Sequence, residues 1–178
     1  MEEKQKSIAA NALQFGLFAG GAMIVYFLVL YIFNQHLNRN LSSLGFIFLI
    51  AAMAYGTFQY RQQYMNNFMS YGKAVTSCFL IGVFAIALSS VFNFIFYNYI
   101  DPGVVQQMLD MAREKMLEKA PNMSDQQMET ALSMQAKFMS PVALTFFGLF
   151  FGAIISLLVS LLVAIFLKKE DKSIMPLV

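Results

Sequence analysis

The sequence predicts an all-α integral membrane protein, a bundle of four transmembrane helices with an extramembrane helical hairpin between helices three and four. Three observations predict this fold. Of the 178 residues, 58% are apolar, whereas soluble domains reach about 45–50% even when glycine is counted. Only 12% are charged, about half the usual share. The charged residues are also absent from four long stretches of the chain.

Each charge-free stretch is long enough for one membrane crossing. The stretches cover residues 7–38, 40–60, 74–100 and 138–167. A helix needs about 20 apolar residues to cross a hydrocarbon core of about 30 Å, and a charge at the bilayer centre costs at least about 2.5–3.5 kcal/mol. We therefore expect one polytopic membrane domain over residues 1–178, with spans near 13–33, 44–59, 75–97 and 142–167.

Two of these spans admit a second interpretation. The second span is short and ends in Gln59 and Tyr60, so a re-entrant segment is the alternative there. The first span follows Lys4 and Lys6, as the core of a signal peptide would. Its apolar run exceeds the usual 7–15 residues, however, and no small-x-small cleavage site follows. We therefore expect a retained helix.

The distribution of cations predicts the orientation. Four spans place both termini on one side. That side carries seven cations: Lys4, Lys6, Arg61, Lys73, Lys168, Lys169 and Lys172. The opposite side carries five: Arg39, Arg113, Lys115, Lys119 and Lys137. The positive-inside rule then predicts cytoplasmic termini.

The segment at about 102–139 predicts a helical hairpin on the outer face. Asp101 is typical of an N-cap, and Pro102 would take the first helical position after it. Pro121 is expected to end this first helix. Ser124 and Gln127 have the spacing of a capping box for the second helix. The apolar face of the hairpin is rich in methionine: Met108, Met111, Met116, Met128, Leu132 and Met139. It either docks a partner, rests on the membrane, or packs within the hairpin and on the ends of the spans.

Small residues repeat every fourth position in two spans. The first span has Gly16 and Gly20, and the last has Gly148, Gly152, Ser156 and Ser160. Such faces let helix backbones approach closely in lipid. We expect a close helix–helix contact, either within the chain or with another protein. The alternative is a narrow polar groove lined by Ser156 and Ser160 together with Ser89 and Asn93.

The chemistry-bearing residue types do not form a recognisable active site. His36 is the one histidine and Cys78 the one cysteine, and no P-loop, HExxH, GxSxG or CxxC motif occurs. We expect a protein that is not an enzyme, with no catalytic residue, cofactor or metal. The net charge of +2 also argues against a nucleic-acid partner.

Several short motifs resemble a known family. They are Tyr60-Arg61, Ser70-Tyr71-Gly72-Lys73-Ala74, Ile100-Asp101-Pro102, Gly152-Ala-Ile-Ile-Ser156 and the terminal Lys168-Lys169. Together they resemble a family of four-helix inner-membrane proteins common in the Bacteroidota and known as a domain of unknown function. The resemblance implies the fold and a bacterial inner membrane, in which the outer face of the hairpin is periplasmic. It assigns no catalytic residue.

These observations favour an interaction or assembly subunit without enzymatic activity. Its expected partners are the lipid bilayer and either another membrane protein or a second copy of the chain. The alternative is a passive carrier or channel for a small solute or lipid.

Overall fold

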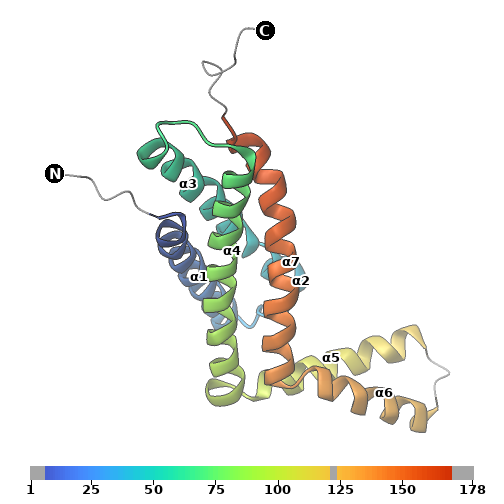
Figure 1. Ribbon diagram of the computed structural model, residues 1–178. Helices are drawn as coiled ribbons and strands as arrows, with labels where there is room; N and C mark the ends of the chain where they lie inside the picture. The colour runs from blue at the N-terminus through green and yellow to red at the C-terminus, as the bar shows by residue number, and fades with distance from the viewer. Residues whose placement is uncertain (1–6, 121–123, 170–178) are drawn as a thin grey trace. The chain divides into compact units, whose positions relative to one another are not determined.

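The computed structural model describes residues 7–120 and 124–169. Four residues used above, Lys4, Lys6, Pro121 and Lys172, lie outside this described part. The described residues form α-helices and one π-helical turn, η1 (Figure 1). The elements are α1 (Ile8–Ile32), α2 (Arg39–Ser43), α3 (Phe46–Tyr64), α4 (Tyr71–Ile95), η1 (Phe96–Ile100), α5 (Gly103–Lys119), α6 (Asp125–Phe138) and α7 (Pro141–Leu167).

Four helical stretches are long and apolar enough to cross a membrane, as the sequence predicted. They are Ile8–Ile32, Arg39–Tyr64, Tyr71–Ile100 and Pro141–Leu167. The second stretch joins α2 and α3 and has 26 residues, so it is longer than predicted. Helix α3 alone has 19 residues, so this length favours a full crossing, and the re-entrant segment stays the alternative.

Large apolar side chains point outward from these helices. Phe18 is 68% exposed, Ile32 72% and Phe166 85%. Water would solvate such a surface unfavourably, whereas lipid tails are as apolar as the side chains themselves. The four helices therefore indicate a multi-pass membrane protein.

Local sequence signals start most of the helices. The Ser7 hydroxyl caps α1 by accepting from the Ala10 amide at 3.1 Å. The capping box predicted for α6 is confirmed, because Ser124 and Gln127 exchange side-chain-to-backbone hydrogen bonds of 3.4 and 3.2 Å. Both devices satisfy amides that the first helical turn leaves unpaired.

The start of α5 differs from the prediction by one residue. Pro102 is the cap residue, and the Asp101 carboxylate accepts from the Gly103 amide at 3.0 Å. The preceding five residues form η1, which the sequence analysis missed. The Asp101 amide closes that turn by donating to the Phe96 carbonyl at 2.9 Å. The wide turn leaves Asp101 outside the helix, so α5 begins at Gly103.

The described chain divides into two compact units. The bundle unit comprises residues 7–89 and 151–169, and the α5–α6 unit comprises residues 90–120 and 124–150. Helices α4 and α7 each contribute residues to both units. Each unit has its own packing, described separately below.

The bundle unit is built around α4. Helix α1 contacts α3 and also lies against α4, where Gly16 faces Phe84. Helix α7 runs beside α4 on the segment where Gly152 meets Ile86 (Figure 1).

One end of the bundle unit is closed by a group of contacts that we call the terminal clasp, formed by Arg61, Met69, Leu167 and Lys169. Met69 and Lys169 exchange two backbone hydrogen bonds of 2.8 and 2.9 Å. Arg61 Nη1 donates to the Leu167 carbonyl at 2.6 Å. The clasp therefore ties the α3–α4 loop and the end of α3 to the end of α7.

Two asparagines turn the chain from α3 into this clasp. Asn66 and Asn67 have φ of 49° and 64°, in the left-handed region that asparagine tolerates better than most residues. The Asn67 amide donates to the Arg61 carbonyl at 3.0 Å and so satisfies a carbonyl near the end of α3.

Candidate functional site

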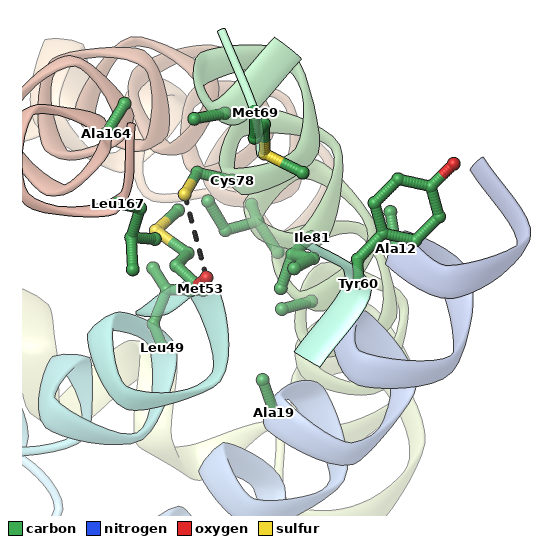
Figure 2. Packing of buried hydrophobic residues seen from close by; sticks show 13 residues of the cluster. Ala12, Ala19, Leu49, Met53, Tyr60, Met69, Cys78, Ile81, Ala164 and Leu167 are labelled. Atoms are coloured by element: carbon green, nitrogen blue, oxygen red, sulfur yellow. Dashed lines mark hydrogen bonds between the residues drawn. The ribbon is translucent and has the colours of Figure 1, made fainter. Parts of the chain in front are cut away.

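The interior of the bundle unit is an apolar cluster contributed by all of its long helices. Leu49, Met53, Ile81 and Ala164 have no exposed surface. Figure 2 shows these side chains converging from α3, α4 and α7, with Ala12 and Ala19 on α1 beside them. Small residues such as Ala12, Ala19 and Ala164 lie among larger ones such as Leu49 and Met53 in this cluster.

A set of buried polar side chains links these helices, and we call it the polar string: Asn11, Thr57, Ser77, Cys78 and Ser156. Asn11 Nδ2 on α1 donates to the Gly56 carbonyl on α3 at 3.0 Å. Thr57 Oγ1 on α3 donates to Ser77 Oγ on α4 at 2.9 Å. Thr57 and Ser77 have no exposed surface.

Cys78 and Ser156 extend the polar string. Cys78 Sγ lies 3.3 Å from Thr57 Oγ1 and donates to the Met53 carbonyl at 3.6 Å, the dashed line in Figure 2. Ser156 Oγ on α7 donates to the Phe79 carbonyl on α4 at 3.5 Å. The string therefore joins α1, α3, α4 and α7 through their interior.

The polar string consists of neutral groups. In the described residues of the bundle unit there is no Asp or Glu, and its cations are Arg39, Arg61, Lys73, Lys168 and Lys169. Across residues 7–120 and 124–169, no group of three or more His, Cys, Asp or Glu side chains could hold a metal ion. The amide and hydroxyl groups of the string donate to carbonyls and to a hydroxyl of neighbouring helices, so the string joins helices.

The small-residue stripes of α1 and α7 both lie against α4 rather than against each other. A Cβ built on Gly16 would come 2.5 Å from Phe84 Cβ, and one on Gly20 would come 2.9 Å from the Ala85 carbonyl oxygen. On α7, a Cβ on Gly152 would come 2.7 Å from Ile86 Cγ2.

The α7 stripe differs along its length. Ser156 and Ser160 have no exposed surface. Gly148, which lies in the α5–α6 unit, is exposed, and a Cβ there would meet only Ser90 Oγ at 3.7 Å among the described atoms. The stripe is therefore a close packing surface in its C-terminal part.

The four residues of the alternative polar groove are not joined to one another by hydrogen bonds. Ser156 donates to Phe79, and the Ser160 hydroxyl donates to the Leu157 carbonyl of its own helix at 2.7 Å. Ser89 and Asn93 are half-buried and belong to different units. Two serine hydroxyls of the predicted groove are thus engaged by backbone carbonyls.

The sequence analysis missed Asn11, Thr57 and Ser77. Each lies within a charge-free stretch, and each was a visible polar residue in a predicted membrane helix or its first turn. A buried polar group in lipid needs a hydrogen-bond partner. A polar residue within an apolar span is therefore the signal in the sequence for a contact between helices. The sequence does not reveal which residue the partner is.

His36 and Cys78, the sole members of their residue types, are both buried. The His36 ring lies 5.1 Å from the Tyr31 ring and 6.2 Å from the Phe27 ring, measured between centroids. The Cys78 thiol is part of the polar string. Both residues therefore take part in internal packing.

In the α5–α6 unit, helices α5 and α6 lie alongside each other and line an open hollow of about 600 Å³. Of its apolar lining residues, Met128 is buried, Leu109 and Leu132 are half-buried and Ala136 is exposed, and its polar lining is exposed. The lining residues are Gln106, Leu109, Asp110, Arg113, Met128, Glu129, Leu132, Ser133 and Ala136.

Two residues of the predicted docking face, Met128 and Leu132, line this hollow. Met128 is buried and Leu132 half-buried. The other four members, Met108, Met111, Met116 and Met139, are half-buried and are not among the lining residues. The methionines thus divide between the hollow and the remaining packing of the two helices.

A protein-family model matches residues 14–169, and its description is "Protein of unknown function (DUF4199)". The match covers nearly the whole described chain. Neither the curated proteins nor the solved structures contained a match.

Proposed function

Because the chain belongs to the DUF4199 family, whose description assigns no activity, we propose a function from its geometry: a non-enzymatic interaction or assembly subunit of a bacterial inner membrane. The hollow between α5 and α6 carries this proposal. It combines an apolar lining, buried at Met128 and half-buried at Leu109 and Leu132, with an exposed charged edge, which is the usual anatomy of a protein interface.

The lining favours a protein segment with an apolar anchor. Leu109, Met128, Leu132 and Ala136 offer an apolar surface for a side chain of the partner. Asp110, Glu129 and Arg113 stand at the exposed edge and provide hydrogen bonds and charges of both signs. An amphipathic helix of another membrane protein has this combination of groups.

Leu132→Asp is expected to lower the yield of the co-purifying partner at least fivefold. The carboxylate would stand in the apolar lining, where an unpaired charge is unfavourable. The measurement is quantitative mass spectrometry of proteins recovered with the tagged chain, at native expression, from membranes in mild detergent.

Met134→Asp is the matched control for this experiment. It introduces the same charge on α6, at a side chain that is 59% exposed and outside the hollow, and it should leave the yield unchanged. A wild-type chain recovered as a monomer without any stoichiometric partner would contradict the proposal.

The orientation proposed is that both termini are cytoplasmic and that α5 and α6 form an extramembrane hairpin in the periplasm. The positive-inside rule supports this orientation. The end of the bundle unit that carries the terminal clasp also carries the cations Arg61, Lys73, Lys168 and Lys169.

A cysteine introduced at the exposed Gln126 should react with a membrane-impermeant maleimide in intact spheroplasts. A cysteine at the exposed Ser70 in the α3–α4 loop should react only after lysis. The wild-type chain is the matched control, because its Cys78 is buried. Reaction of Ser70→Cys alone in intact spheroplasts would reverse the orientation.

A passive carrier or channel has less support. Its polar lining would include Ser156 and Ser160, and both hydroxyls donate to backbone carbonyls. A path for a polar solute would need to break these bonds.

A further inference from the structure

We propose that the terminal clasp of the bundle unit is a binding site for the phosphate headgroup of an anionic phospholipid. This inference goes beyond the proposed assembly role and requires only that the chain spans a membrane. It rests on cations that the fold gathers at one end of the bundle unit and on aromatic rings at the same level.

The clasp fixes the backbone that carries two of these cations. The paired hydrogen bonds between Met69 and Lys169, 2.8 and 2.9 Å long, hold the residue that follows α7 against the α3–α4 loop. Lys168 still donates its amide to Ala164 at 2.9 Å, as the continuation of the helix. Both lysine side chains are exposed, so their ammonium groups are accessible to a ligand.

Arg61 brings a third cation to the end of α7 that carries the two lysines. Its Nη1 donates to the carbonyl of Leu167, the residue directly before Lys168 and Lys169. The guanidinium lies 5.0 Å from the centroid of the Phe58 ring. One bond to a carbonyl leaves the charge of Arg61 unneutralised, and among the described residues Arg61 Nε is buried without a hydrogen-bond partner.

The positive charge of this end is not balanced within the described bundle unit. Its described residues include Arg61, Lys73, Lys168 and Lys169 at this end and contain no Asp or Glu. Like charges held close together repel, and a bound anion relieves that repulsion. A phosphodiester suits the site because guanidinium and ammonium groups are the side chains that bind phosphate best.

The aromatic residues of the same end place the cations at the membrane surface. The Tyr71 hydroxyl donates to the Leu161 carbonyl at 3.0 Å, and Tyr60 and Tyr64 pack with ring centroids 5.4 Å apart. Lys169 Nζ lies 5.7 Å from the Phe68 ring centroid. Tyrosine prefers the headgroup level, which is where an anionic lipid carries its phosphate. These observations favour a lipid over free phosphate as the ligand.

The test is a titration of the full chain in neutral detergent with short-chain phosphatidylglycerol, compared with short-chain phosphatidylcholine and with inorganic phosphate. We expect saturable binding of phosphatidylglycerol, which weakens from 0.1 to 1 M salt because the Debye length falls from about 10 to about 3 Å. Equal binding of phosphatidylcholine would overturn the proposal. Phosphate binding as tight as phosphatidylglycerol would assign the site to the free ion and would also overturn it.

Two double variants separate charge from structure. Lys168→Gln with Lys169→Gln keeps the backbone bonds of Lys169 and should weaken phosphatidylglycerol binding about 30-fold, which is about 2 kcal/mol at 1.4 kcal/mol per tenfold. Glu170→Gln with Asp171→Gln changes the next two residues in the sequence and removes charge of the opposite sign. This control should strengthen binding a few-fold. Unchanged binding in the lysine variant, or equal weakening in both variants, would refute a site built on these cations.

Discussion

Gly16→Ala is expected to lower the free energy of unfolding by about 1–3 kcal/mol, the usual cost of adding a methyl group to a packed interior. The added Cβ would come 2.5 Å from Phe84 Cβ, 2.9 Å from the Ile81 carbonyl oxygen and 3.2 Å from the Ala85 amide nitrogen. All three atoms are backbone or Cβ atoms of α4, so no side-chain rotation can make room. Helix α1 must move away from α4.

Gly21→Ala is the matched control for this change. It makes the same substitution on the same helix, at a position where an added Cβ meets nothing within 4 Å. Alanine is a better helix former than glycine by about 0.5–1 kcal/mol, so Gly21→Ala should be neutral or stabilising. Unfolding of both variants in parallel, by SDS titration or by heating in detergent, measures the difference. Equal stability of the two variants would show that α1 and α4 are not in close contact at Gly16.

The difference between Gly16 and Gly21 shows which part of the helix packing could be predicted from the sequence. The four-residue spacing of Gly16 and Gly20 singles out these two as a small-residue face and leaves out Gly21, although Gly21 is next to Gly20. The sequence does not identify the opposing helix, because close approach depends on the register between helices that are far apart in the chain. Both stripes turn out to face α4, whose own small residues form shorter runs.

Features that depend on a few neighbouring residues were easier to predict. The capping box of Ser124 and Gln127 involves a single helical turn and was read directly from its spacing. The C-terminal end of α3 was harder to predict. The helix runs five residues past the predicted end at residue 59, to Tyr64, and the chain then turns through Asn66 and Asn67 in left-handed geometry. The π-helical turn at residues 96–100 follows α4 without a break, and no residue pattern in the sequence marks it.

The candidate sites also differ in whether they depend on neighbouring residues or on contacts between distant helices. The amphipathic pattern of α5 and α6 indicated an apolar face, and Met128 and Leu132 of that face line the hollow. The polar string was not predicted, because isolated hydroxyls such as Thr57 and Ser77 are common in membrane helices and neither one alone marks a contact. The contact exists only because α3 and α4 bring the two side chains within 2.9 Å.

Thr57→Val is expected to lower the free energy of unfolding by about 1–2 kcal/mol. Valine has nearly the same shape as threonine, so the packing is retained while the hydroxyl is lost. The change removes the hydrogen bond to Ser77 Oγ and the contact with Cys78 Sγ. Ser77 has no exposed surface, so water cannot replace the lost partner. Thr57→Ser, which restores the hydroxyl, should recover most of the loss.

Thr76→Val tests whether this loss comes from the link between helices. Thr76 lies beside Ser77 on α4, but its hydroxyl donates to the Gly72 carbonyl of its own helix at 2.9 Å and is exposed. Its replacement should change the stability by less than about 0.5 kcal/mol. A double-mutant cycle with Thr57→Val and Ser77→Ala should give a coupling of about 0.6–1.7 kcal/mol. If the two single losses simply add, the hydroxyls do not interact, and the polar string does not hold α3 to α4 at this point.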